Sequence, residues 1–162
     1  MVKKIFYALV VMPLIFGCDN DEGDCCKTIE AVMFFDVTNS EDLDLLDPNS
    51  GGIDTSLIEI LYTNQDEEMV LVNNSQLDGS KGYVIIEPDA AGNPYRIKVF
   101  LNIDHIESNV SYTHIKWSSD NMDEIKTEFD LSNNNIIAKK IWVNGELKWE
   151  SSSSELLISL VK

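Results

Sequence analysis

Alternation of apolar and polar residues with a period of two is the feature that most constrains this chain. From Tyr95 to Ile103 every odd position is apolar and most even positions are polar. Residues 125–131 repeat the pattern, with a threonine in one of the apolar positions. Successive side chains of a strand point to opposite faces, so each stretch predicts a half-buried strand. No segment of any length shows the apolar stripe of an amphipathic helix, which favours an all-β fold.

The Asn-Gly pair at 144–145, within IIAKKIWVNGELKWE, predicts a tight hairpin. Both central residues of a type I′ turn need positive φ, which Asn and Gly adopt at low cost. A two-residue loop would pair Trp142 with Leu147 and Lys140 with Trp149. The period of two then puts the two tryptophans and Leu147 on one face. Their apolar company predicts that this face is core rather than an exposed platform for sugars.

Further runs rich in apolar and β-branched residues complete the all-β prediction. They cover about 29–37, 57–63, 69–72, 83–87, 110–118 and 156–161. Turn-forming residues separate these runs. Short strands at this spacing predict one antiparallel β-sandwich of immunoglobulin-like size, with about 7–10 strands over residues 28–162. A barrel-like fold is the alternative.

The first residues have the composition of an export signal. Lys3 and Lys4 precede an uncharged apolar run, and Gly17-Cys18 follows that run. A membrane-spanning helix needs about 20 apolar residues, so the run is too short to remain as a span. We therefore expect residues 1–17 to be a signal peptide. An ordinary secretory peptide, in which Cys18 has no special role, is the alternative to processing directly before Cys18.

The motif Leu14-Ile15-Phe16-Gly17-Cys18 resembles the bacterial lipobox. The resemblance implies cleavage before Cys18, attachment of diacylglycerol to its sulfur, and acylation of the new amino terminus by a fatty acid such as palmitate. Two or more acyl chains hold a protein stably on a membrane, whereas one chain holds it only marginally. Residues 18–27 would then be a lipidated acidic tether, because they lack large apolar side chains.

Four further stretches extend the resemblance over most of the chain: DNDEGD after Cys18, the loop DLLDPNSGG, HIKW, and KIWVNGELKW. Together they are similar to small lipoproteins of Bacteroidota. The resemblance implies a β-sandwich-like domain and carries over no catalytic or ligand-binding residue. In that phylum, acids after the lipidated cysteine resemble a signal for the outer face of the outer membrane. An outer-membrane lipoprotein at the cell surface is thus expected, with a periplasm-facing location as the alternative.

The charge of the chain argues against some classes of partner. It contains 28 acidic and 12 basic residues, a formal net charge of −16. Removing residues 1–17 takes away Lys3 and Lys4 and no acid, which makes the charge −18. Such a chain repels phosphate backbones, so nucleic acid is not an expected partner. It also repels anionic lipid headgroups, which leaves the lipid anchor as the means of membrane attachment.

The cysteines provide no disulfide framework for the domain. They are Cys18, Cys25 and Cys26. If Cys18 carries lipid, only the adjacent pair remains, in a compartment that permits disulfides. Neighbouring Cα atoms lie about 3.8 Å apart, below the usual disulfide range of about 4.4–6.8 Å, so a bridge between them would be strained. We expect free thiols or an intermolecular bridge near the anchor.

His105 and His114 are the candidate catalytic residues, because only their side chains titrate near neutral pH without a perturbed environment. His114 is expected on the outward face of its strand, opposite Ile115 and Trp117. His105 follows Asp104 at a strand end. No motif such as G-x-S-x-G accompanies them. Surface histidines without a catalytic role are therefore the favoured interpretation, and no catalytic residue is assigned.

The acidic segment 40–54 is a candidate for calcium binding. It brings Asp42, Asp44, Asp47 and Asp54 into one long loop with a proline and two glycines. Oxygen ligands from a flexible loop suit Ca²⁺. A solvated loop has the same composition, so no metal site and no cofactor is assigned.

The leading functional hypothesis is a non-enzymatic binding or interaction module, displayed on a lipid tether. Its partner would be another envelope protein, a glycan or a cation. Domains of this kind usually act through loops or exposed strand edges. The alternatives are an envelope hydrolase that uses His105 or His114 with acidic partners, and a structural component of the envelope.

Overall fold

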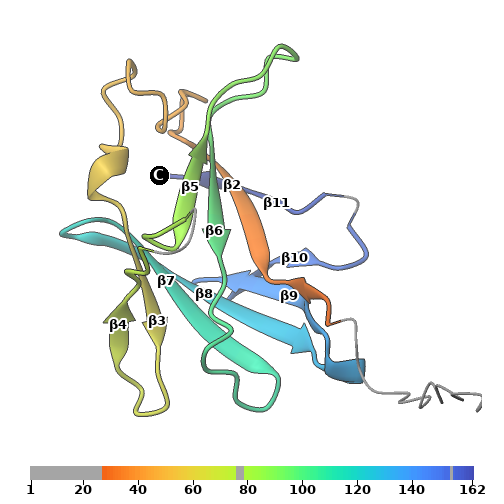
Figure 1. Cartoon of the computed structure of the whole chain (residues 1–162). Helices are drawn as coiled ribbons and strands as arrows, with labels where there is room; N and C mark the ends of the chain where they lie inside the picture. The colour runs from red at the N-terminus through yellow and green to blue at the C-terminus, as the bar shows by residue number, and fades with distance from the viewer. Residues whose placement is uncertain (1–26, 76–78, 154) are drawn as a thin grey trace, which may run out of the picture.

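Eleven strands in two sheets make up the fold in the computed structural model, which describes residues 27–75, 79–153 and 155–162 (Figure 1). This confirms the all-β prediction and is consistent with a sandwich or a barrel-like fold. The predicted signal peptide, Cys18, nearly all of the tether and the Cys25–Cys26 pair lie outside the described residues. Within those residues, no helix has the length and apolar character needed to span a membrane.

The elements follow the predicted runs closely, and the two 3₁₀ turns lie in loops. The strands are β1 (Ile29–Glu30), β2 (Val32–Thr38), β3 (Glu59–Thr63), β4 (Met69–Leu71), β5 (Tyr83–Ile86), β6 (Arg96–Phe100), β7 (Val110–Ser118), β8 (Asn121–Asp130), β9 (Ile136–Val143), β10 (Glu146–Glu150) and β11 (Leu157–Val161). The 3₁₀ turns are η1 (Thr55–Leu57) and η2 (Ser132–Asn134).

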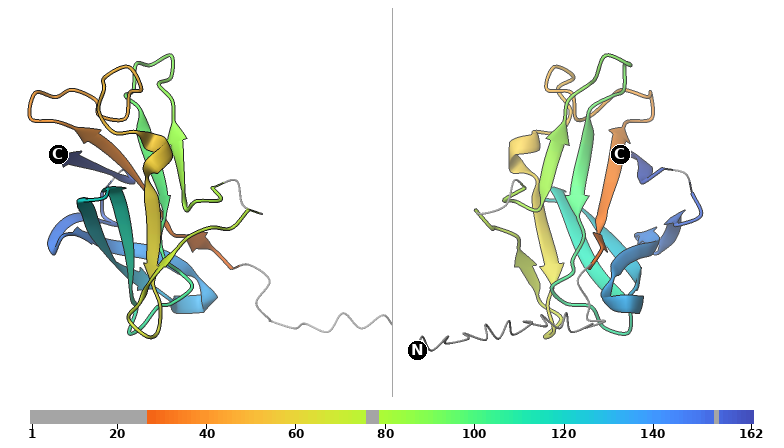
Figure 2. Two further views of the ribbon diagram at one scale, coloured as in Figure 1. Left: turned by 90° about the vertical axis from the view of Figure 1, so that its left-hand side faces the viewer. Right: turned by 45° about the vertical axis from the view of Figure 1, so that its right-hand side comes forward.

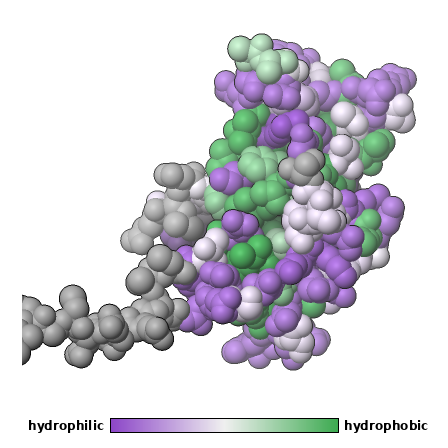
Figure 3. Space-filling view, turned by 90° about the vertical axis from the view of Figure 1, so that its right-hand side faces the viewer, coloured by the Kyte–Doolittle hydropathy of each residue, from purple (hydrophilic) through white to green (hydrophobic). Residues whose placement is uncertain are grey.

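The larger sheet has seven strands in the order β1-β9-β8-β7-β3-β4, with β10 paired to β9. The smaller sheet has the order β11-β2-β6-β5. Figure 2 shows that the strands of the two sheets run in clearly different directions, with the β3–β4 hairpin at one margin. On the flank where β10 and β11 lie, apolar surface gathers near the middle of the face (Figure 3).

Two strand pairs are parallel, which the purely antiparallel prediction did not include. β1 pairs with β9, and β11 pairs with β2. The predicted single strand at 29–37 is divided at Ala31, because β1 belongs to the larger sheet and β2 to the smaller one. Parallel neighbours need long connections, so pairings of this kind leave no local signal in the sequence.

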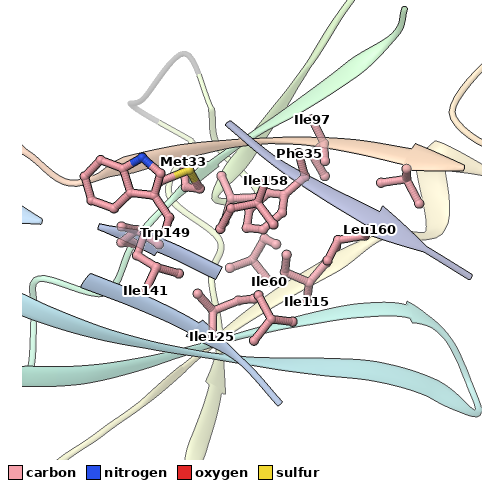
Figure 4. Close-up of a cluster of buried hydrophobic side chains, with 14 of the residues drawn as sticks. Met33, Phe35, Ile60, Ile97, Ile115, Ile125, Ile141, Trp149, Ile158 and Leu160 are labelled. Atoms are coloured by element: carbon pink, nitrogen blue, oxygen red, sulfur yellow. The ribbon is translucent and has the colours of Figure 1, made fainter. Parts of the chain in front are cut away.

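The core lies between the sheets (Figure 4). Met33 and Phe35 of β2 and Ile97 of β6 are fully buried from the side of the smaller sheet. Ile115 of β7 and Ile125 of β8 are fully buried from the other. Burying one large apolar side chain contributes about 1.5–3 kcal/mol. Most apolar positions of the alternating stretches are therefore core, as predicted, whereas Leu131 at the end of the second stretch is exposed.

The β9–β10 hairpin has the predicted turn. Asn144 and Gly145 have φ values of 50° and 82°, the positive values that a type I′ turn requires. Glu146 pairs with Val143, and Leu147 pairs with Trp142, as expected from a two-residue loop. The turn chemistry therefore determines the first two residue pairs of the hairpin.

Beyond those pairs, β-bulges overturn the prediction of the buried face. Trp149 pairs with Ile141 rather than with Lys140. A bulge moves the following side chains to the other face of a strand. Trp149 and Ile141 are consequently buried, whereas Leu147 is 44% exposed. Trp142 is only half-buried, so the prediction that it belongs to the core is wrong.

Trp142 lies on the outer face of the larger sheet. Its cross-strand neighbours there are Leu147 of β10 and Lys126 of β8. The Lys126 ammonium is 5.0 Å from the centre of the Trp142 ring. The alkyl stem and the ammonium of a lysine can cover one face of an aromatic ring in this way, even when the ring is outside the core.

Candidate functional site

A cleft opens where the β3–β4 hairpin meets the loop that connects β6 to β7. Its main hollow has a volume of about 450 Å³. A second hollow of about 310 Å³ shares Thr63, Asn64, Gln65 and His105 with the first. The two hollows are therefore parts of one cleft, which is long enough to hold more than a single small group.

The lining of the main hollow combines a short apolar strip with many polar side chains. Tyr62, Val70, Leu71 and Val72 form the strip. The polar side chains are Thr63, Asn64, Gln65, Asn73, Asn74, Asn102, Asp104 and His105. Ligand sites commonly have an apolar lining with a few convergent polar groups that fix the orientation of the ligand.

Asn64 shapes the hairpin side of the cleft. Its backbone N–H donates to the carbonyl oxygen of Glu68 at 2.9 Å. Its side-chain Oδ1 accepts from the backbone N–H groups of Asp66 and Glu68, each at 2.9 Å. Asparagine favours turns because its side chain can take the place of a backbone acceptor. The β3–β4 turn is therefore closed by the residue that also lines both hollows.

Asn102 holds the opposite side of the cleft, and it is fully buried. Its backbone N–H donates to Thr113 Oγ1 at 2.8 Å. Its side-chain Nδ2 donates to the carbonyl oxygens of Thr63 and Tyr112, at 2.9 and 3.1 Å. Buried polar groups are costly unless they are paired, and this one joins the loop to both β3 and β7.

The remaining acceptors of Asn102 fix the residues next to it. Its Oδ1 accepts from the backbone N–H groups of Asp104 and His105, at 3.1 and 3.2 Å. Its carbonyl oxygen accepts from the Ser111 hydroxyl at 2.6 Å. These bonds define where the Asp104-His105 dipeptide enters the cleft.

Tyr62 forms a fixed part of the apolar strip. Its hydroxyl donates to the carbonyl oxygen of Phe100 at 2.9 Å, which joins β3 to β6 across the sandwich. Burial raises the pKa of Tyr62 to about 12, and the negative charge of Asp104 acts in the same direction. Tyr62 therefore stays neutral over the physiological range and retains its hydrogen bond.

His105 lies in the cleft, where it lines both hollows and is half-buried. Its sequence neighbour Asp104 is exposed and lines the main hollow. Of the two predicted histidines, His105 is thus the one whose side chain reaches the cleft.

His114 is on the outer face of β7, as predicted, but it is not a surface residue. It is only 7% exposed, because Leu61 of β3 and Glu124 of β8 lie beside it in register. Its Nε2 is 3.0 Å from Thr63 Oγ1. Its Nδ1 has no hydrogen-bond partner among the described residues. Burial lowers the pKa of His114, against the opposing effect of Glu124.

Three of the four predicted calcium ligands, Asp44, Asp47 and Asp54, accept hydrogen bonds from nearby donors. Asp44 accepts from the backbone N–H groups of Leu46 and Tyr95, both at 2.9 Å. Asp42 has a φ of 60° in the preceding turn. The Asp44 contacts tie the loop to the start of β6.

Asp47 and Asp54 are engaged in the same way. Asp47 accepts from the backbone N–H of Asn49 at 2.8 Å. Asp54 accepts from the backbone N–H and the hydroxyl of Ser56, which lowers the pKa of Asp54. Among the residues the structure describes, no three His, Cys, Asp or Glu side chains form a group that could hold a metal ion. Calcium binding by this loop stays a prediction.

The residues that build the cleft, above all Asn102, were not predicted from the sequence. The alternation places Asn102 at an outward, polar position, whereas the structure buries it completely. A usable signal was present in the sequence Asn-Ile-Asp-His directly after a strand. Asparagine there can accept hydrogen bonds from the next two or three residues and end the strand in a turn.

Comparisons of the chain with protein-family models, with curated proteins and with solved structures find no match.

Proposed function

We propose that this chain is a lipid-anchored binding module of the cell envelope, whose ligand site is the cleft between the β3–β4 hairpin and the β6–β7 loop. The cleft itself carries the proposal: a hollow of about 450 Å³ with an apolar strip and convergent amide and carboxylate groups. Asn64 and Asn102 orient its two sides through satisfied hydrogen bonds. A preorganised site of this kind loses little entropy when it binds a ligand.

The attachment part of the proposal rests on the lipobox-like motif that ends at Cys18. It predicts that cells grown with an alkyne analogue of palmitate label the full-length chain, and that Cys18→Ser abolishes the label. Protease treatment of intact cells then distinguishes cell-surface display from a periplasm-facing location. Labelling that survives Cys18→Ser would contradict the lipid anchor.

A hydrolase that uses His105 is the second candidate function. The position of His105 favours this candidate over a hydrolase that uses His114. His105 and Asp104 both line the cleft, whereas His114 contacts it only through Thr63. A general base must lie within hydrogen-bonding reach of its substrate. This candidate predicts that His105→Ala removes any hydrolytic activity found by substrate screening and that His114→Ala leaves activity in the folded fraction.

Binding is tested with the full-length chain in detergent, probed on a glycan array and against a library of extended peptides. Asp104→Asn alters the cleft, and Asp120→Asn is its matched control, because Asp120 is exposed in the β7–β8 turn. We expect a ligand whose affinity falls about tenfold with Asp104→Asn and stays unchanged with Asp120→Asn. If no glycan or peptide gives binding that depends on the cleft, the proposed site is wrong.

A further inference from the structure

Strand β4 has an open edge beside the cleft. β3 is its only strand neighbour among the described residues, and β4 lies at the margin of the larger sheet (Figure 1). The backbone N–H of Asn64 donates to Glu68, and that of Val72 donates to Ile60. In an antiparallel pair, residues alternate between facing the partner strand and facing away from it. The N–H and C=O groups of Met69 and Leu71 therefore face away from β3.

The side chains of this edge are apolar and exposed. Met69, Val70 and Leu71 are each 50% exposed. Folded proteins usually protect an edge strand with lysine, proline, a bulge or a covering loop. β4 has no lysine or proline, and its pairing with β3 contains no bulge. An edge of this kind is a ready template for another strand.

Two hollows border β4. The main hollow of the cleft and a separate one of about 230 Å³ share Leu71, Val72 and Asn73. Leu57, which is 66% exposed, and Ile58 also line the separate hollow. Alternate side chains of a strand point to opposite faces. A strand added to β4 would thus lie beside both hollows, with its alternate side chains pointing to opposite faces of the sheet.

The charge at one end of the edge indicates the partner. Five exposed acids surround the end of the cleft next to the β3–β4 turn: Asp66, Glu67, Glu68, Asp104 and Glu107. Within the described part of the chain, none of them takes part in an ion pair. Basic residues at the corresponding end of a bound segment would be complementary to these charges.

We propose that the edge of β4 binds an extended polypeptide segment by strand addition, and that this segment is apolar at alternate positions and basic at one end. This deepens the proposed function and rests on it, because the main hollow of the cleft would lie beside the bound segment. Main-chain hydrogen bonds give such complexes their affinity, and the flanking hollows select the side chains.

The probe is a synthetic peptide of alternating valine and threonine with two lysines at one end, prepared with the lysines at either terminus. Binding to the full-length chain in detergent is measured by fluorescence anisotropy. We expect the peptide with its lysines at one of the two termini to bind with a Kd below about 1 mM, and the peptide with its lysines at the other terminus to bind more weakly. Replacing the lysines by glutamates should weaken binding about fivefold, and Glu67→Lys should reduce that preference.

Methylation of the peptide's backbone nitrogens distinguishes binding by strand addition from binding by apolar side-chain contact alone. N-methylation at one set of alternate peptide residues should weaken binding about tenfold, and methylation at the other set should leave it unchanged. In hydrogen exchange, the amides of Met69 and Leu71 should gain protection when the peptide binds. The amide of Val70 faces β3 and should change little.

A protein variant provides the matching test. Leu71→Pro removes an N–H that faces the free edge and leaves the bonds to β3 in place, as proline on edge strands allows. Leu71→Ala keeps that N–H and is the control. We expect about a tenfold loss of affinity for Leu71→Pro and a smaller loss for Leu71→Ala. If Leu71→Pro does not fold, the methylated peptides still test the proposal on the unaltered chain.

The outcomes distinguish the inference from the proposed function. Peptide binding without alternation in the methylated series, or without protection of Met69 and Leu71, would overturn strand addition and leave the cleft as a binding site. Cleft-dependent binding of glycans with no peptide binding would do the same. If Met69 and Leu71 gain protection with protein concentration alone, the occupant is a second copy of the chain, and the proposed partner is wrong. Absence of any cleft-dependent ligand would remove both proposals.

Discussion

The two ends of β7 are held by hydrogen-bonded clusters of opposite electrical character. At its first residues, the neutral side chain of Asn102 joins β7 to β3 and to the loop of the cleft. At its last residues, the buried carboxylate of Asp123 accepts from Trp117 Nε1 at 2.7 Å, from Asn144 Nδ2 at 2.9 Å and from Lys162 Nζ. The first cluster positions the candidate site, and the second fastens the two sheets together.

The charged cluster joins the sheets through the residue after β11. Lys162 donates its backbone N–H to the carbonyl oxygen of Thr38 at 2.8 Å, in the smaller sheet. Its ammonium lies 5.5 Å from the centre of the Trp117 ring and forms an ion pair with Asp123, in the larger sheet. Burial alone would raise the pKa of Asp123. Hydrogen bonds from Lys162, Asn144 and Trp117 outweigh that effect and hold the pKa below its ordinary value.

The contrast between the two clusters separates structure from recognition in this fold. A neutral cluster beside the cleft leaves the charge there to exposed acids, which a ligand can approach. A charged cluster needs several donors to offset the cost of burial, and it lies at the end of β7 away from the cleft. The two clusters should therefore respond differently to mutation and to pH.

The largest effect is expected when the neutral cluster is broken by Asn102→Ala. Four backbone groups lose their partner: the carbonyls of Thr63 and Tyr112 and the N–H groups of Asp104 and His105. We expect a loss of about 4 kcal/mol in the free energy of unfolding, measured by urea denaturation. Asn93→Ala, in an exposed loop, should cost less than about 1 kcal/mol. Equal losses in the two variants would contradict the role of Asn102.

Breaking the charged cluster by Asp123→Asn should have the next largest effect. The amide presents donors toward Lys162 and Asn144, which are donors themselves. We expect a loss of about 3 kcal/mol in the free energy of unfolding, by the same measurement. Asp120→Asn is the matched control, because it removes an exposed acid from the same hairpin and should change stability by less than about 0.5 kcal/mol.

At acidic pH the effect of Asp123→Asn on the free energy of unfolding should disappear, whereas the effect of Asn102→Ala should remain. The pKa of Asp123 is lowered in the folded chain, so its stabilisation is complete above the unfolded pKa of about 3.9 and is lost as the pH falls through the folded pKa. The difference between the unaltered chain and Asp123→Asn should shrink below about pH 4. The difference for Asn102→Ala should stay constant. Parallel pH curves for the two variants would contradict this contrast.

His114, midway along β7, should give the smallest effect and in a separate pH window. Burial lowers its pKa, so its neutral form stabilises the fold above the unfolded pKa of about 6.5, and this contribution falls as the pH drops. Between pH 7 and pH 5 the unaltered chain should lose more stability than His114→Gln, by less than about 1.4 kcal/mol. Identical pH dependence of the two proteins in thermal denaturation would show that His114 is not the group responsible.

Local patterns predicted where the strands lie but not which faces and edges they present. The strand ranges and the turn at Asn144 depend on neighbouring residues, and the structure confirms them. The passage between sheets at Ala31 depends on partners far along the chain, whereas the bulge beside Trp149 shifts the pairing within one hairpin. One bulge is enough to place Trp149 on the face opposite Trp142 and Leu147.

Of the residues that line the cleft, only His105 was a candidate from the sequence, in the hydrolase alternative. The walls of the cleft depend on contacts such as Tyr62 with Phe100 and Asn102 with Thr63, which join residues 38 and 39 positions apart. The burial of His114 likewise depends on its cross-strand neighbours in β3 and β8. No periodicity within one strand contains that information.

The parallel pairing of β1 with β9 has a consequence for the speed of folding. Thr28 and Asn135, which share a hydrogen bond beside that pair, are separated by 107 positions. β2 and β11 join segments that are comparably distant. Contacts of such range require closure of long loops before they stabilise anything, so we expect folding on the millisecond-to-second scale rather than in microseconds. A ribosome-bound chain that ends before β9 would leave β1 unpaired, with its backbone groups available to chaperones.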